Sequence, residues 1–154
     1  MQTNLPVSPP LYSDLPLGRH LAVLSKLYFS RLYQKLTLHD VDRYYSVLVF
    51  VDKSHAAVSQ QDIGDFLDID KATMVRVIDG FVEKDYLLRT ANPNDRRSYL
   101  ISLTAKGKAM IPVIQKAIDD LSVEIMEGTT DEEQKVFRKV TCLLTRNLKK
   151  PLSL

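Results

Sequence analysis

Apolar residues recur every three or four positions along most of this chain, which is the spacing of helices that bury one face. The pattern predicts a helix from about Pro16 to residue 38. It predicts a second helix from an Asp40 cap through the apolar run that ends at Val51. Residues 1–14 hold three prolines and few charges, so we expect an extended tail there.

The second half of the chain predicts two further helices. One begins at a Thr104 cap, runs to about Met126 and contains Pro112, which should kink it because proline lacks the backbone donor. The other is opened by Thr130–Glu133, a capping box. The outer helices cannot cover a small central unit and also bury their own long apolar stripes, so we expect a homodimer.

The segment between residues 59 and 107 departs from this helical spacing of apolar residues and is the most informative part of the chain. Ser59 is a good N-cap for a short helix, with Asp62 three residues on as an imperfect capping-box partner. Asp68–Asp70 predicts a turn, after which Asp70 caps a second helix over residues 71–84. Residues 87–91 and 99–103 predict two strands joined by the tip Asn92–Arg97. The inward stripe of the second helix is expected to consist of Val75, Ile78, Phe81 and Val82.

A helix pair followed at once by a hairpin can present one helix to the DNA major groove. Lys71, Thr73 and Arg76 lie on the polar face of the second helix near its N-terminus, where side chains reach base edges. Ser59 and Gln60 open the preceding helix, where backbone N–H groups can bind phosphate. For a helix taken alone, a solvated amphipathic face is the commoner explanation, and the hairpin favours the DNA interpretation.

The hairpin tip carries Asp95, Arg96 and Arg97. An arginine at such a tip can enter a neighbouring minor groove, and a carboxylate two residues earlier can hold its guanidinium in one direction. A polar turn with incidental charges is the alternative.

Composition and charge restrict the function without deciding it. The formal charge is +2, and residues 59–97 hold six basic and eight acidic side chains, a net of −2 that argues mildly against DNA binding. The longest apolar run is too short for a membrane span, and the first residues lack the features of a signal peptide. A single cysteine fits a reducing cytoplasm.

Residues 95–107, DRRSYLISLTAKG, resemble the wing signature of the MarR family (multiple antibiotic resistance regulators), and residues 70–79 resemble its recognition helix. The resemblance implies a mainly α fold with a small β-hairpin wing. Residues 39–103 would form the winged helix-turn-helix, and residues 15–38 and 104–154 the helical dimerisation region, within one compact domain overall. The resemblance also implies that Asp95 and Arg97 are the paired wing carboxylate and minor-groove arginine, and that Arg96 touches phosphate. It places Thr73 and Arg76 where the helix faces the major groove.

Two residues depart from the family pattern. Asp85 stands where a glycine usually follows the recognition helix, and Asp can adopt the left-handed conformation at a cost. Gly80 stands inside that helix and should weaken it by up to ~1 kcal/mol.

Other candidate sites are weaker. The resemblance implies a pocket for an aromatic effector, with Tyr28, Tyr44 and Tyr45 as candidates, although such residues are more often core. Cys142 is expected to be a buried small hydrophobe rather than a redox sensor. The three histidines lack the pairing of a metal site and no catalytic set is visible, so neither metal, cofactor nor enzymatic activity is expected.

The sequence therefore predicts a cytoplasmic, homodimeric transcriptional regulator that binds double-stranded DNA at a pseudo-palindromic operator. We expect it to be a repressor released by a small-molecule effector. The main alternative is a winged-helix module that binds a protein instead of DNA, which the acidic balance favours. A small enzyme is the second alternative.

Overall fold

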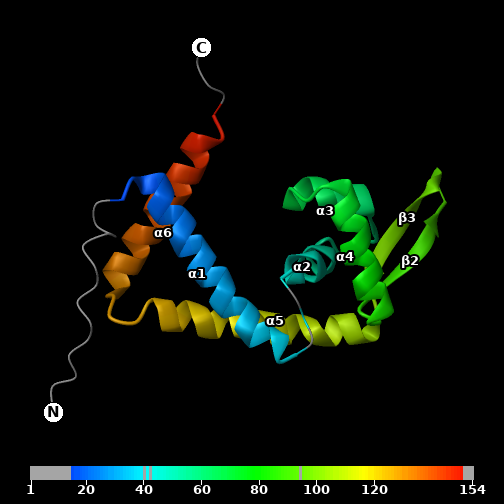
Figure 1. The fold of residues 1–154 in the computed structure, drawn as a ribbon, viewed down its shortest axis with the longest axis horizontal. Helices are drawn as coiled ribbons and strands as arrows, with labels where there is room; N and C mark the ends of the chain where they lie inside the picture. The colour runs from blue at the N-terminus through cyan, green and yellow to red at the C-terminus, as the bar shows by residue number, and fades with distance from the viewer. Residues whose placement is uncertain (1–14, 40, 42, 94, 151–154) are drawn as a thin grey trace. The chain divides into compact units, whose positions relative to one another are not determined.

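The computed structural model describes residues 15–39, 41, 43–93 and 95–150, with the backbone alone for residues 96 and 97. The chain divides into two compact units, one up to Ile118 and one from Asp119 onward. The described elements are α1 (Leu17–Thr37), α2 (Tyr45–Lys53), β1 (Val58–Ser59), α3 (Gln60–Leu67), α4 (Lys71–Glu83), β2 (Leu87–Asn92), β3 (Asp95–Leu103), α5 (Ala105–Ile125) and α6 (Asp131–Leu148). Figure 1 shows the β2–β3 hairpin following directly on α4.

The sheet is larger than the predicted hairpin. It is antiparallel with the order β1-β3-β2, so β3 lies in the middle. Val58 pairs with Ile101 and Ser59 with Leu100, which ties the segment before α3 to the hairpin. Two residues are too few to produce an alternating pattern, and this is why the sequence did not reveal β1.

The predicted helix caps are confirmed. Ser59 and Asp62 form a reciprocal capping box on α3, and the Asp70 carboxylate accepts a 2.9 Å bond from the Thr73 N–H at the start of α4. Thr130 and Glu133 form the second predicted box on α6. These caps fix where three of the helices begin.

Two predictions about the central helices need correction. α2 begins at Tyr45, without a side-chain cap, and the Asp40 cap predicted for it lies outside the described residues. In α4 the buried stripe is Met74, Val77, Ile78 and Phe81. Val75 is 37% exposed and Val82 is only half-buried, because the spacing i, i+3, i+4, i+7 starts one residue earlier than predicted.

The core of the first unit gathers one or more side chains from every helix of that unit and from the hairpin. Its fully covered members include Leu32, Leu36, Leu48, Ile63, Met74, Ile78, Leu87, Ile101 and Ile114. α4 thereby has a fixed buried face, and its opposite face is left for solvent or a partner.

The junction between α4 and β2 is tied to the start of α5. Thr104 Oγ1 donates to the Asp85 carbonyl (2.6 Å) and accepts from the Gly107 N–H (2.9 Å), so the predicted Thr104 cap is confirmed. Lys106 Nζ donates to the Lys84 carbonyl at the C-terminus of α4 (2.7 Å). Asp85 takes the left-handed conformation, with φ of 59°, as expected.

The second unit leaves most of its apolar residues uncovered, although Leu121 is buried. α6 has no buried residue, and Val136, Phe137, Val140, Leu143 and Leu148 are all exposed on it. The expectation that Cys142 is buried is wrong for the single chain, because its thiol is exposed on the same helix.

Pro112 lies inside α5, and its kink stays a prediction. No helix among the described residues combines the length and the apolar character needed to cross a membrane.

Two alanine substitutions at glycines should change stability in opposite directions. A Cβ at Gly107 would lie 2.1 Å from the Tyr86 carbonyl oxygen, so Gly107→Ala should lower the free energy of unfolding by about 1–3 kcal/mol. A Cβ at Gly80 meets nothing within 4 Å, so Gly80→Ala should raise it by up to ~1 kcal/mol. Urea unfolding followed by circular dichroism measures both, and a stabilising Gly107→Ala would contradict the close approach.

Candidate nucleic-acid interface

The N-terminal turns of α4 present a mixed polar face. Lys71 and Arg76 are exposed and Thr73 is half-buried, so the three predicted reading residues lie on or beside the accessible side of the helix. Val75, predicted for the core, lies on the accessible side as well. This face is available because Met74, Val77, Ile78 and Phe81 hold the other side of α4 in the core.

Thr73 and Arg76 contact each other before any partner is present. Arg76 Nη2 donates to Thr73 Oγ1 at 3.2 Å, one helical turn away. The Asp70 cap lies beside them, and its hydrogen bonds from the Thr73 hydroxyl and N–H hold the pKa of the Asp70 carboxyl below its usual range. The start of α4 is therefore a small network that orients Arg76.

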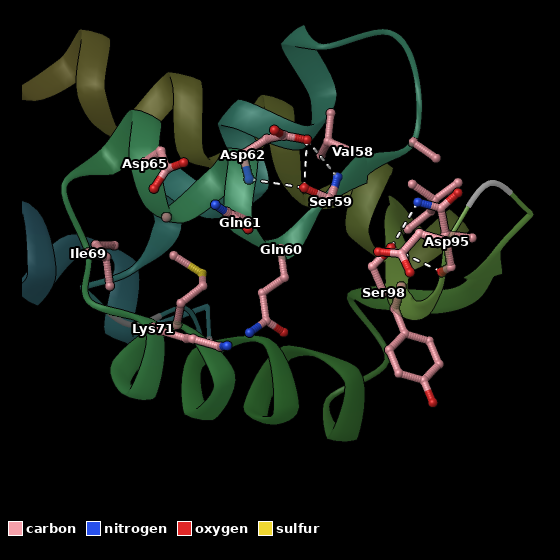
Figure 2. Close-up of a pocket in the computed structure, with 16 residues that line it drawn as sticks. Val58, Ser59, Gln60, Gln61, Asp62, Asp65, Ile69, Lys71, Asp95 and Ser98 are labelled. Atoms are coloured by element: carbon pink, nitrogen blue, oxygen red, sulfur yellow. Dashed lines mark hydrogen bonds between the residues drawn. The ribbon is translucent and has the colours of Figure 1, made fainter.

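The hydrogen-bonding groups of Ser59, a predicted phosphate contact, are used within the capping box of α3. Its hydroxyl donates to Asp62 Oδ2 (2.6 Å) and accepts from the Asp62 N–H (3.1 Å), and its own N–H donates to the same carboxylate (3.1 Å). A carboxylate thus already occupies the N-terminus of α3. Gln60, the next residue, has no such bond among those described and extends from α3 toward α4 (Figure 2).

A groove lies between α3, the start of α4 and the wing, with a volume of about 840 Å³. Gln60 and Lys71 line its helical side, while Asp95, Ser98 and Tyr99 line its wing side (Figure 2). The structure therefore brings residues from both predicted parts of the interface to one concave surface of the first unit.

Most acidic residues between positions 59 and 97 have structural roles. Asp62 and Asp70 cap helices, and Asp79 forms an ion pair with Arg89 between α4 and β2. Asp68 and Asp85 occupy left-handed positions, with φ of 53° and 59°, at the ends of α3 and α4. The net charge of −2 thus reflects caps and turns more than the character of the exposed face.

The wing tip is tighter than predicted. β2 continues to Asn92 and β3 begins at Asp95, so Asp95, Arg96 and Arg97 belong to a strand rather than to the connecting turn. The structure describes only the backbone of Arg96 and Arg97, so the pairing of Asp95 with Arg97 stays a prediction. Sequence reasoning placed Asn92 in the turn and gave Ser98 no role of its own, although both carry side-chain hydrogen bonds at this tip.

The candidate effector tyrosines lie away from this groove, in α1 and at the start of α2. Tyr28 packs edge-on against Phe29, which stacks on Tyr33. Burial raises the pKa of the Tyr45 hydroxyl, and the nearby Tyr28 and Tyr33 raise it further. Tyr44 instead holds Arg43 over its ring, 4.9 Å from the centroid.

Within the described residues no group of three His, Cys, Asp or Glu side chains could hold a metal ion.

Comparison with known proteins finds one family whose sequence model matches this part of the chain. The sequence model of the MarR family matches residues 45–99, from the start of α2 into β3. The matched part of the chain contains the helix pair and most of the hairpin described above.

Solved structures of MarR proteins share the fold. Wild-type MarR from E. coli in its apo form is 24% identical, with a TM-score of 0.76 over 84% of this chain and 96% of that chain. A MarR transcriptional regulator from Methanosarcina mazei Go1 is 22% identical, with a TM-score of 0.71 over 86% and 96% of the two chains. A cysteine-to-serine mutant of E. coli MarR, complexed with operator DNA, is 24% identical with a TM-score of 0.75 over 89% and 99%.

The Asp70 cap predicts that the stability of α4 is sensitive to acid. Because the pKa of Asp70 is lowered in the folded state, its stabilisation is complete above its ordinary value of 3.8 and is lost as the pH falls through the lowered value. Asp70→Ala should lower the melting temperature at pH 7 and remove this part of the acid transition. Asp70→Asn keeps a capping acceptor and should lose the pH dependence while retaining most of the stability. Thermal melts between pH 2 and 7 measure both, and equal loss in the two variants would contradict the cap.

Proposed function

We propose that this chain is a homodimeric, sequence-specific regulator that binds double-stranded DNA and represses transcription until a small molecule releases it. The observation that carries the proposal is the single groove whose two sides are the start of α4 and the wing. In the first unit, a duplex meeting α4 would also meet the hairpin. E. coli MarR, which shares the fold, has been solved with operator DNA.

The start of α4 would read bases in the major groove. Arg76 can take guanine bidentately, and Thr73, which already accepts from Arg76, would direct its guanidinium. Lys71 lies at the first turn of α4 and would contact phosphate or guanine. Ser59 and Gln60 would support this contact at the phosphates beside the N-terminus of α3, Ser59 chiefly by fixing the helix through its capping box.

The wing would contact the neighbouring minor groove. Arg97 would enter that groove, with Asp95 directing its guanidinium, while Arg96 would bind phosphate. A narrow minor groove has an enhanced negative potential, so an arginine is favoured there even without hydrogen bonds to particular bases.

Dimerisation would cover the apolar stripes that each unit leaves exposed. On α1 these are Leu17, Leu21, Leu24 and Leu27, and on α6 they are Val136, Phe137, Val140, Leu143 and Leu148. Burying such stripes is worth about 25 cal/mol per Å² of apolar surface. A two-fold dimer would read a pseudo-palindromic operator whose half-sites lie about one helical turn, ~34 Å, apart.

Release by an effector requires unequal affinity for two forms of the dimer. An aromatic molecule binding near Tyr28, Tyr44 and Tyr45 would act next to α1, which carries one of the proposed dimer stripes. The chain would work in the cytoplasm, where a single free cysteine is stable in its reduced form.

The acidic balance of residues 59–97 favours one rival, a winged-helix module that binds a protein. Selection of bound duplexes from a random pool, followed by fluorescence anisotropy at several salt concentrations, separates the two. The regulator should enrich one pseudo-palindromic sequence and lose affinity steeply with salt. Equal, weak binding to all sequences at low salt would support the rival.

Arg76→Ala and Arg97→Ala should weaken binding to the selected duplex in different ways. Arg76→Ala should cost ~1–3 kcal/mol at one base pair and relax the preference there. Arg97→Ala should weaken binding while preserving the preferences of the major groove, because its groove carries a degenerate code. Lys108→Ala, an exposed change at the start of α5, is the matched control. Intact selectivity in Arg76→Ala would remove α4 from the proposed interface, and unchanged affinity in Arg97→Ala would remove the wing.

A further inference from the structure

The tip of the wing departs from regular strand pairing. Ala91 and Asn92 are neighbours on β2, but their partners on β3 are Tyr99 and Asp95. Residues 96–98 therefore form a bulge of three residues on β3, set between the partners of two consecutive β2 residues. Arg96 and Arg97 both lie in this bulge, so its backbone decides where they leave the sheet.

Two short side chains close the base of the bulge. Asn92 Nδ2 donates to Ser98 Oγ at 2.9 Å, and Ser98 Oγ donates to the Asp95 carbonyl at 3.2 Å. These two bonds join β2 to both ends of the bulge, and Figure 2 shows Asp95 and Ser98 side by side on the wing. Asn92 and Ser98 are half-buried, so the bond between them is partly shielded from water.

We propose that Asn92 and Ser98 are positioning residues of the wing, which hold the bulge Arg96–Ser98 in one conformation so that its arginines meet DNA already ordered. The inference rests on the proposed function. A bulge lacks the ladder bonds that order an ordinary strand, and ordering it at the moment of binding would reduce affinity. The two bonds, here called the Asn92–Ser98 brace, remove that cost in the free protein.

The brace is separable from the fold. The rest of the hairpin is held by the regular pairing of β2 residues 87–91 with β3 residues 99–103, and β1 pairs with β3 on its other side. The brace lies at the far end of the hairpin from the buried residues Leu87, Ile101 and Leu103. Its removal should therefore loosen the tip without unfolding the domain.

The first measurement uses the free protein. Ser98→Ala removes the hydroxyl, and Ser98→Thr keeps it on a side chain that suits a strand. In ¹⁵N relaxation, the order parameters of the Arg96 and Arg97 amides should fall from about 0.85 toward 0.6 in Ser98→Ala and recover in Ser98→Thr. Asn92→Ala should reproduce the fall from the other strand. Unchanged order parameters in both alanine variants would overturn the brace, whether or not the chain binds DNA.

The second measurement uses the duplex that the wild-type protein enriches from a random pool. Ser98→Ala should weaken its binding about 3- to 10-fold, as expected for a lost hydrogen bond, and Ser98→Thr should restore it. The Arg97→Ala substitution should cost less in the Ser98→Ala background than in the wild type, because the brace acts through the arginine. The melting temperature of Ser98→Ala should stay close to that of the wild type.

The outcomes separate this inference from the proposed function. If the wild type binds its selected duplex but the effects of Ser98→Ala and Arg97→Ala are additive, the positioning role is overturned and the regulator stands. If the wild type enriches no duplex, the proposed function falls, and the role of the brace in DNA binding falls with it. Loss of order in Ser98→Ala together with coupling to Arg97 supports the inference.

Discussion

The contact between the backbone of Gly107 and the carbonyl of Tyr86 is the constraint on which the geometry of the first unit depends. Only a residue without a Cβ allows α5 to begin so close to the end of α4. This approach brings Thr104 against the Asp85 carbonyl and Lys106 against the Lys84 carbonyl. The C-terminus of α4, the first residues of the wing and the start of α5 are therefore tied together, and these contacts fix where the wing leaves α4.

Helix caps explain a composition that at first argues against DNA binding. A short helix-turn-helix needs an acceptor at each helix start and a residue that tolerates positive φ at each helix end. In this chain aspartate fills most of those positions. A carboxylate in such a cap keeps its charge, but the positive end of the helix dipole lies beside it and offsets part of that charge. Net charge over a segment is thus a weaker guide here than the exposed face of α4.

The two units differ in how much of their apolar surface they bury. The first holds a well-covered core and directs polar residues into one groove, whereas α6 in the second has no buried residue of its own. A helix with that much exposed apolar surface gains stability from a partner, and the prediction of a dimer follows from this uncovered surface as well as from the sequence. The thiol of Cys142 lies on the same helix, so its exposure in a single chain is tied to what covers α6.

The sequence alone determined the features that depend on neighbours along the chain. The capping boxes at Ser59 and Thr130 and the Asp70 cap follow from residues three positions apart, and the structure has all of them. Only the tertiary structure decided features that depend on segments far apart: the strand β1, the rotation of α4 that exposes Val75, and the brace between Asn92 and Ser98. Two-residue strands, the exact face of a helix and the register of a bulge leave no periodic trace, because each is set by what packs against it from another part of the chain.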